Sequence, residues 1–185
     1  MNVLNSILVL AAAFLAVFGE SVFPGLRNLL GAQIDLLPAL IIYAALNTNI
    51  MVMALLAIFG GLCFDSLSAN PLGLSILPLF IVGFPVFLQR DLILRGLPFA
   101  QLVLGGIASA AVPLLAVLLL LTAGKQPLLG WSSLWQWIVM IAGGAVATPA
   151  FFTLFNWCDH ALGYQPRTES SFRPDREILR GRRTN

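Results

Sequence analysis

Long apolar runs, separated by short polar interruptions, dominate the chain up to about residue 163. An α-helix rises about 1.5 Å per residue, so about 20 apolar residues cross a hydrocarbon core of about 30 Å. The pattern predicts an all-α integral membrane protein with a single bundle of about six transmembrane helices in residues 1–163. The expected spans cover residues 3–19, the two halves of 36–64, 72–88, 99–123 and 135–157.

The run 36–64 decides between five and six spans. Its roughly 29 residues would form a straight helix of about 43 Å, which is too long for one crossing and short for two. Asn47, Thr48 and Asn49 fall in its middle, where exposure to lipid would be costly. Two short spans joined by a tight turn are therefore expected. One tilted helix, which gives five spans, is the alternative.

Composition agrees with a membrane location. Hydrophobic residues make up 59% of the chain and charged residues 10%, and the mean hydropathy is +0.92. Soluble domains contain about 45–50% apolar and about 25% charged residues. The run 3–19 follows only Met1 and Asn2, without the basic residues of a signal peptide, so it is expected to be retained as the first span.

The basic residues gather in a C-terminal tail, residues 164–185. Of the 10 Lys and Arg residues, six lie beyond residue 165: Arg167, Arg173, Arg176, Arg180, Arg182 and Arg183. Basic residues concentrate on the cytoplasmic side and favour anionic lipid, so both termini are expected to be cytoplasmic. Charge bias cannot choose between five and six spans, because most basic residues are cytoplasmic in both. A nucleic-acid partner is not expected, because no folded basic surface accompanies the tail.

Few residues carry candidate chemistry. The chain has one histidine, His160, and its two cysteines, Cys63 and Cys158, lack the spacing of a metal or redox motif. Nucleotide-binding and Gly-x-Ser-x-Gly motifs are absent. We therefore expect no enzyme, no metal and no cofactor. Among the acids, Asp35 and Asp65 are candidates for a place near the membrane, where an ionisable group is by default a functional-site candidate.

The polar turn 65–73 reads Asp-Ser-Leu-Ser-Ala-Asn-Pro-Leu-Gly. Asp65 is expected to accept hydrogen bonds from backbone N–H groups after the third span. Asn70 is expected to cap the next helix, with Pro71 at its first position, where no donor is needed. Gly73 is expected to permit close packing. A binding surface is the alternative interpretation of the same turn.

Small residues recur at four-residue spacing within several runs. Such stripes let helix backbones approach closely in a membrane. Packing within the chain is the first expectation, and a homo-oligomer or a partner helix is the alternative. The pairs are Ala12/Ala16, Ala57/Gly61, Gly105/Ser109, Gly106/Ala110 and Gly143/Ala147.

Three segments, in this order, resemble the bacterial rod shape-determining MreD family. The first runs from Asp35 to Tyr43, the second is Gly60-Gly61-Leu62, and the third is the turn from Asp65 to Gly73. The resemblance covers about residues 33–90, whereas the rest of the chain agrees only in length and hydropathy. The motif residues, which are candidates for partner binding, are Asp35, Pro38, Gly60, Gly61, Asp65, Ser68, Asn70, Pro71 and Gly73.

This resemblance implies a small, non-enzymatic protein of the bacterial inner membrane that acts in cell elongation. Its fold would be similar to the substrate-binding S-components of energy-coupling-factor vitamin transporters. Its direct partner would be MreC, which connects it to the RodA polymerase, a class B penicillin-binding protein and MreB filaments. The tail arginines Arg176, Arg180, Arg182 and Arg183 would bind membrane lipid or a cytoplasmic partner.

The chain departs from this family in two places. It lacks basic residues before the first span, and its second turn is Asn47-Thr48-Asn49 where relatives often carry positive charge. The rival interpretation is a vitamin-binding transport subunit, because Ala12 and Ala16 resemble the motif with which S-components dock their transmembrane partner. A binder should show polar and aromatic residues converging on a ligand, and the sequence offers few candidates.

Overall fold

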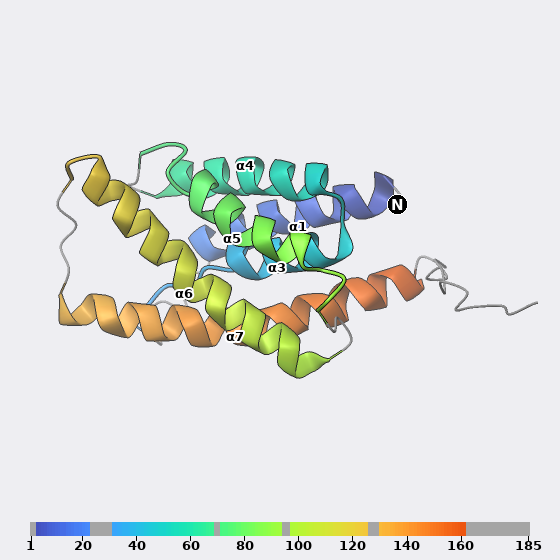
Figure 1. Cartoon of the computed structure of the whole chain (residues 1–185). Helices are drawn as coiled ribbons and strands as arrows, with labels where there is room; N and C mark the ends of the chain where they lie inside the picture. Colours follow the sequence, from blue (N-terminus) through green and yellow to red (C-terminus); the bar gives the residue numbers. More distant parts are fainter. Residues whose placement is uncertain (1–2, 23–30, 69–70, 94–96, 126–129, 162–185) are drawn as a thin grey trace, which may run out of the picture.

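The computed structural model describes residues 3–22, 31–68, 71–93, 97–125 and 130–161. Within these residues the chain is all-helical, with no strand. Figure 1 shows the helices running roughly along one common direction. They are α1 (Val3–Val22), α3 (Leu37–Asn47), α4 (Ile50–Leu67), α5 (Ile76–Leu88), α6 (Pro98–Thr122) and α7 (Trp131–Ala161).

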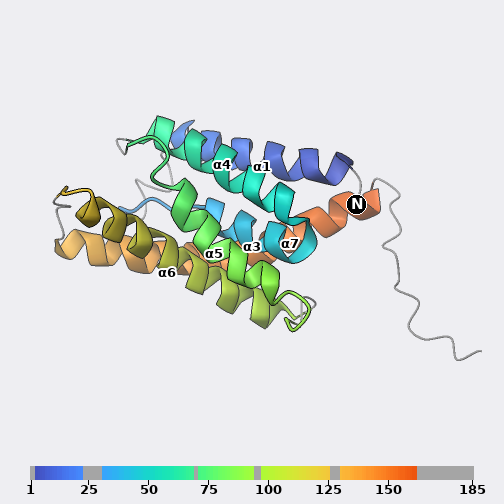
Figure 2. The same ribbon diagram turned by 45° about the horizontal axis from the view of Figure 1, so that its top comes forward.

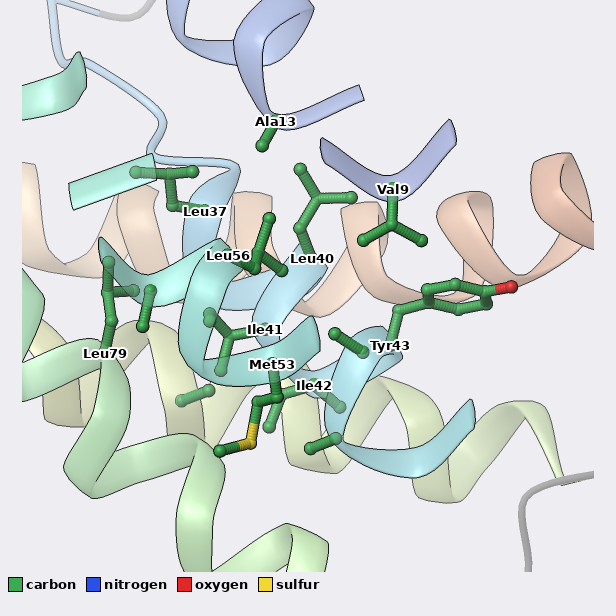
Figure 3. Close-up of a cluster of buried hydrophobic side chains, with 14 of the residues drawn as sticks. Val9, Ala13, Leu37, Leu40, Ile41, Ile42, Tyr43, Met53, Leu56 and Leu79 are labelled. Carbon is green, nitrogen blue, oxygen red and sulfur yellow. The ribbon is translucent and has the colours of Figure 1, made fainter. Parts of the chain in front are cut away.

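Helix α3 lies at the centre of the bundle. All residues from 37 to 46 are buried, and α3 contacts each of the other five helices. Its side chains form one hydrophobic core with α1, α4 and α5 (Figure 3), where Leu40, Met53 and Leu56 have no exposed surface. Tyr43 extends this core to α7 by stacking on Phe155, with 4.3 Å between the ring centroids. An apolar helix enclosed on every side carries no polar face, which is why α3 shows no amphipathic pattern.

The chain reverses direction between α3 and α4 at Thr48 and Asn49. Thr48 donates its hydroxyl and its backbone N–H to the carbonyl of Ala44, at 2.6 and 2.8 Å, so it closes the last turn of α3. Asn49 is extended, and α4 begins at Ile50. The expectation of two helices with a tight turn is therefore confirmed, and a continuous helix over 36–64 is wrong.

Among the described residues, three helices are long and apolar enough to cross a membrane: Ile50–Leu67, Pro98–Thr122 and Trp131–Cys158. The segments Ser6–Glu20, Leu37–Asn47 and Ile76–Leu88 are apolar but shorter. At about 1.5 Å per residue, the 11 residues of α3 extend about 16 Å, half of a hydrocarbon core. The structure thus supports a membrane protein whose central helix is not a full-length span.

The two ends of the bundle carry different connections. The start of α1, the α3–α4 turn, the α5–α6 connection and the end of α7 lie at one end, which we call the terminal end (Figure 1). Arg90 joins two of these connections by donating from Nη1 to the carbonyl of Thr48 at 3.2 Å. The ends of α4 and α6 and the starts of α5 and α7 lie at the opposite end, which we call the junction end.

Helices α1 and α4 lie side by side at one edge of the bundle, whereas α6 and α7 cross on the other side of α3 (Figures 1 and 2). The α6–α7 contact depends on small residues. A Cβ atom at Gly105 would overlap Oγ1 of Thr148, and one at Gly144 would overlap Oγ of Ser109. Glycine therefore allows the two backbones to approach at this crossing.

Candidate functional site

Asp65 connects the end of α4 to the start of α5. Its Oδ2 accepts the backbone N–H of Ser75 at 3.0 Å, and its Oδ1 accepts the Ser75 hydroxyl at 2.6 Å. Ser75 is the N-cap residue of α5 and makes no side-chain cap of its own, so the carboxylate of Asp65 supplies the cap from the preceding helix. Asp65 is 1% exposed. The expected role of Asp65 is confirmed, and Ser75 is the partner that sequence reasoning missed.

The rest of the turn differs from the expected capping arrangement. Helix α5 begins at Ile76 and not at Pro71, which instead accepts the backbone N–H of Leu74 at 3.2 Å. Asn70 lies outside the described residues. Gly73 has a φ of +89°, and the nearest atom to a Cβ there would be 3.9 Å away. Gly73 is therefore needed for a left-handed backbone conformation and not for close packing.

The glycine pair on α4 sets two helix contacts at the junction end. A Cβ at Gly60 would lie 2.9 Å from Cδ2 of Leu37, at the start of α3. A Cβ at Gly61 would lie 3.0 Å from the backbone nitrogen of Ile76, at the start of α5. Ser68 ends α4 by donating its N–H to the carbonyl of Phe64 at 3.0 Å. Gly60 and Gly61 thus allow α4 to pack against the first residues of two neighbouring helices.

The non-helical segment 31–36 leads into α3 and is held by polar side chains. Leu36 donates its N–H to Oε1 of Glu20 at 2.8 Å, and Leu37 donates to Oδ1 of Asp35 at 2.9 Å. The side chain of Gln136 bonds both the N–H and the carbonyl of Gln33, at 3.2 and 2.9 Å. Backbone of this kind at membrane depth needs partners from protein. Glu20 and Gln136 supply them.

Sequence reasoning did not identify two of these residues, Glu20 and Gln136. Their signal is a polar side chain close to the end of an apolar run. Asp35, which was expected near the membrane, is 5% exposed and accepts the backbone N–H of Leu37. Pro38 lies in the first turn of α3, where a backbone N–H has no acceptor within the helix, so the missing N–H of proline costs no hydrogen bond.

Most small-residue stripes are used for packing inside the chain. Ala57 and Gly61 are buried, Ala12 and Ala16 pack against the core, and Gly143 faces Ile34. Gly105 and Ser109 lie in the α6–α7 crossing. This agrees with the first expectation and leaves the stripes little free surface for a partner helix.

Within the described parts of the chain, no group of three or more His, Cys, Asp or Glu side chains is placed to hold a metal ion. Cys63 and Cys158 are free thiols. The tail arginines Arg176, Arg180, Arg182 and Arg183 lie outside the described residues. The site that the structure does assemble is a set of hydrogen-bonded junctions at one end of the bundle.

The fold and these junctions define the class of protein: an all-helical chain with apolar helices that could cross a membrane, built around an enclosed central helix. Comparison with protein-family models, with curated proteins and with solved structures finds no match.

Proposed function

We propose that this protein is a non-enzymatic scaffold of the bacterial inner membrane, of the MreD family, that binds an MreC-like single-span protein. Through that partner it would support cell-shape control and lateral peptidoglycan synthesis, with RodA, a class B penicillin-binding protein and MreB as indirect neighbours. The proposed fold is a six-span bundle similar to the S-components of energy-coupling-factor transporters. In it, α3 and the segment 31–36 together make one crossing.

The observation that supports this proposal is the meeting of the three motif segments at the junction end. Leu37, two residues after Asp35, contacts Gly60; Gly61 contacts the start of α5; and Asp65 caps that same helix. Segments that are far apart in the motif therefore form one structural unit. Residues that form one structural unit depend on one another, which would explain why they occur together as a motif.

The outer surface of this unit is the proposed contact for the partner. Leu67 and Leu72 belong to the same turn region as Asp65 and are 57% and 71% exposed, whereas Asp65 is buried. A juxtamembrane segment of a single-span partner could cover these two leucines without disturbing the cap. The motif residues would then act by holding the turn in shape, and the exposed leucines by touching the partner.

Co-purification from native membranes tests the scaffold. Replacing Leu67 and Leu72 together by Ser should reduce recovery of the MreC-like partner several-fold, because exposed interface leucines contribute through their buried apolar area. The chain should stay inserted. Leu92→Ser is the matched control, since Leu92 is 85% exposed and follows α5, which ends at Leu88, away from the α4–α5 turn. Nanomolar binding of a water-soluble vitamin, with no such partner recovered, would favour the transport alternative instead.

Cysteine labelling tests the proposed orientation, in which both termini are cytoplasmic. With Cys63 and Cys158 replaced by Ala, a cysteine at Asn49 should react only with reagent supplied from the cytoplasmic side, and one at Leu72 only from outside. Both positions are exposed, whereas Thr48 is buried and would label poorly. Labelling of both from the same side would contradict the topology.

The tail is proposed to bind anionic lipid. Each arginine near a charged surface contributes about 1 kcal/mol, and the attraction weakens with salt. Replacing Arg176, Arg180, Arg182 and Arg183 by Gln should weaken sedimentation of a peptide covering residues 164–185 with anionic vesicles. Binding that is insensitive to salt would count against this role.

A further inference from the structure

Among the described helices, α5 is the shortest one with an exposed apolar face. Its 13 residues extend about 20 Å along the helix axis. It lies between α4 and α6 (Figures 1 and 2) and turns one face away from the bundle. Residues that recur every three or four positions share one side of a helix. The exposed residues on this face, which we call the α5 face, are Leu77, Phe80, Ile81, Pro85 and Leu88.

Polar groups limit the apolar length of α5 at both of its ends. Just after the helix, Gln89 is exposed and the side chain of Asp91 is 85% exposed. Just before it, residues 71–75 are not helical, and Asp65 binds Ser75. A charged side chain is costly in hydrocarbon, and irregular backbone exposed to lipid does not occur there. The part of α5 that suits hydrocarbon is therefore the helix itself, without its flanking residues.

Hydrogen bonds fix the position of α5 along the bundle. Asp65 belongs to α4, so its two bonds to Ser75 tie the start of α5 to the last turn of α4. Arg90 binds the carbonyl of Thr48, so the end of α5 is tied to the turn that precedes α4. Helix α5 therefore cannot slide toward either membrane surface without breaking one of these contacts.

Helix α7 offers a much longer apolar surface to the same bilayer. It carries no charged residue over the 28 residues Trp131–Cys158, about 42 Å of helix, and it extends past both ends of α5 (Figures 1 and 2). A hydrocarbon core of about 30 Å suits α7 but exceeds the length of α5 by about 10 Å. A surface that is too short is accommodated by a thinner bilayer, by flanking side chains that reach the interface, or by association. Gln89 and Asp91 have short side chains that cannot bridge this difference.

We propose that the α5 face is a lipid-binding surface for phospholipids with short or disordered acyl chains, beside which the bilayer is thinned by about 10 Å. The headgroups of these lipids reach the level of Ser75 on one side and of Gln89 on the other. Around α7 the bilayer keeps its full thickness. Thinning requires that the chain crosses a membrane, as in the proposed function, but it requires no MreC-like partner.

Spin labels at two matched pairs of positions test the thinning, in a full chain whose two native cysteines are replaced by Ala. Leu77→Cys and Leu88→Cys place single labels on α5, and Ala142→Cys and Thr153→Cys place them on α7. All four positions are exposed, and each pair is 11 residues apart, about 17 Å along a helix. In dioleoylphosphatidylcholine vesicles, relaxation by a water-soluble nickel chelate relative to relaxation by oxygen reports the depth of a label. Both α5 labels should be several-fold more accessible to nickel than the α7 labels.

Short-chain dimyristoleoylphosphatidylcholine provides the control, because a thin bilayer already fits α5 and the difference between the pairs should shrink. A difference of the same size in both lipids would overturn the thinning, and so would equal accessibility of the two pairs in the dioleoyl lipid. One shallow and one deep label on α5 would also overturn it, since α5 would then lie off-centre in a flat bilayer. Exclusion of both reagents from α5 would show that protein and not lipid covers this face.

The label experiment also separates this surface from the scaffold function. If all four labels met nickel without enrichment of oxygen, the chain would not lie in a bilayer, and both the membrane location and the thinning would be wrong. If the labels behaved as expected but no MreC-like protein co-purified, the scaffold alone would be wrong.

Discussion

Helices α3 and α7 are both apolar, yet they meet their surroundings in opposite ways. Ten consecutive residues of α3 are buried, and the helix is only 11 residues long. Helix α7 has 31 residues and exposes large side chains along its length. These exposed residues are Trp131, Leu134, Trp135, Ile138, Val146, Leu154 and Trp157. Apolar sequence alone therefore does not distinguish an enclosed helix from one that faces lipid.

Helix α3 is enclosed by the neighbouring helices and by polar groups at its two ends. Lipid chains are as apolar as leucine, so van der Waals packing and hydrogen bonds must hold helices together in a bilayer. Glu20 and Asp35 bind the first amides of α3, and Arg90 binds the carbonyl of Thr48 at its other end. Opposite charges at the two ends complement the helix dipole.

Helix α7 has the length and the exposed apolar surface of a helix that could cross a membrane. Trp135 and Trp157 are exposed and lie 22 residues apart, about 33 Å along a helix. This separation matches the thickness of a hydrocarbon core, and tryptophan concentrates at its two interfaces. Exposed tryptophans therefore lie near both ends of α7 at a spacing that suits a membrane crossing.

The largest expected difference between the two environments is in the effect of leucine truncation. Leu40→Ala on α3 should lower the free energy of unfolding by about 2–5 kcal/mol, because it leaves a cavity between packed helices. Leu118→Ala on α6, where the leucine is 55% exposed, should change it by less than about 0.5 kcal/mol. Reversible unfolding in mixed micelles measures both changes in free energy. Equal losses for the two variants would show that Leu40 is packed no more tightly than Leu118.

Breaking the cap between α4 and α5 should cost somewhat less. Asp65→Ala leaves the buried N–H and hydroxyl of Ser75 without an acceptor, at about 1–3 kcal/mol. Ser66→Ala is the neighbouring control, because Ser66 is exposed. In a double-mutant cycle, Ser75→Ala should recover part of the loss. Strict additivity of the two substitutions would show that they do not interact.

Adjacent glycines on α6 offer a sharper test of the α6–α7 crossing. Gly105→Ala would overlap Thr148 and should destabilise the protein by about 1–3 kcal/mol. At Gly106 the nearest atom to a new Cβ is 3.6 Å away, so Gly106→Ala should be neutral or gain up to about 1 kcal/mol of helix propensity. The same unfolding experiment compares them, and a reversed order would contradict the crossing.

The smallest expected effect is at the C-terminus of α3. Arg90→Gln removes a positive charge from that end and should cost about 0.3–1 kcal/mol, an effect that added salt reduces. Lys125→Gln removes an exposed charge just after the end of α6 and should have no such effect. Unfolding at low and high salt distinguishes them. A salt-independent loss at Arg90 would indicate packing, for instance on the Phe87 ring beneath it.

The sequence alone predicted the helices and the turn at 47–49, because apolar runs and polar interruptions are local signals. It also predicted that Asp65 accepts hydrogen bonds. It placed the start of α5 too early, because Pro71 is a strong local signal for a helix start. The residue that Asp65 actually binds, Ser75, lies ten positions further along the chain, and only the folded structure shows that hydrogen bond. The pairing of Gln33 with Gln136 crosses 103 residues, and no local pattern contains it.

That last pairing has a consequence for how the protein is made. The backbone of the segment 31–36 is completed by a side chain on the final helix, and α3 also needs α6 and α7 on one side. At about 5–20 residues per second, a ribosome takes roughly 5–20 s to proceed from Gln33 to Gln136. During that interval α3 has been synthesised but α7, which packs against it, has not. Packing of α7 is therefore the step that completes the bundle, and a chain stalled before it should be a preferred target for quality control.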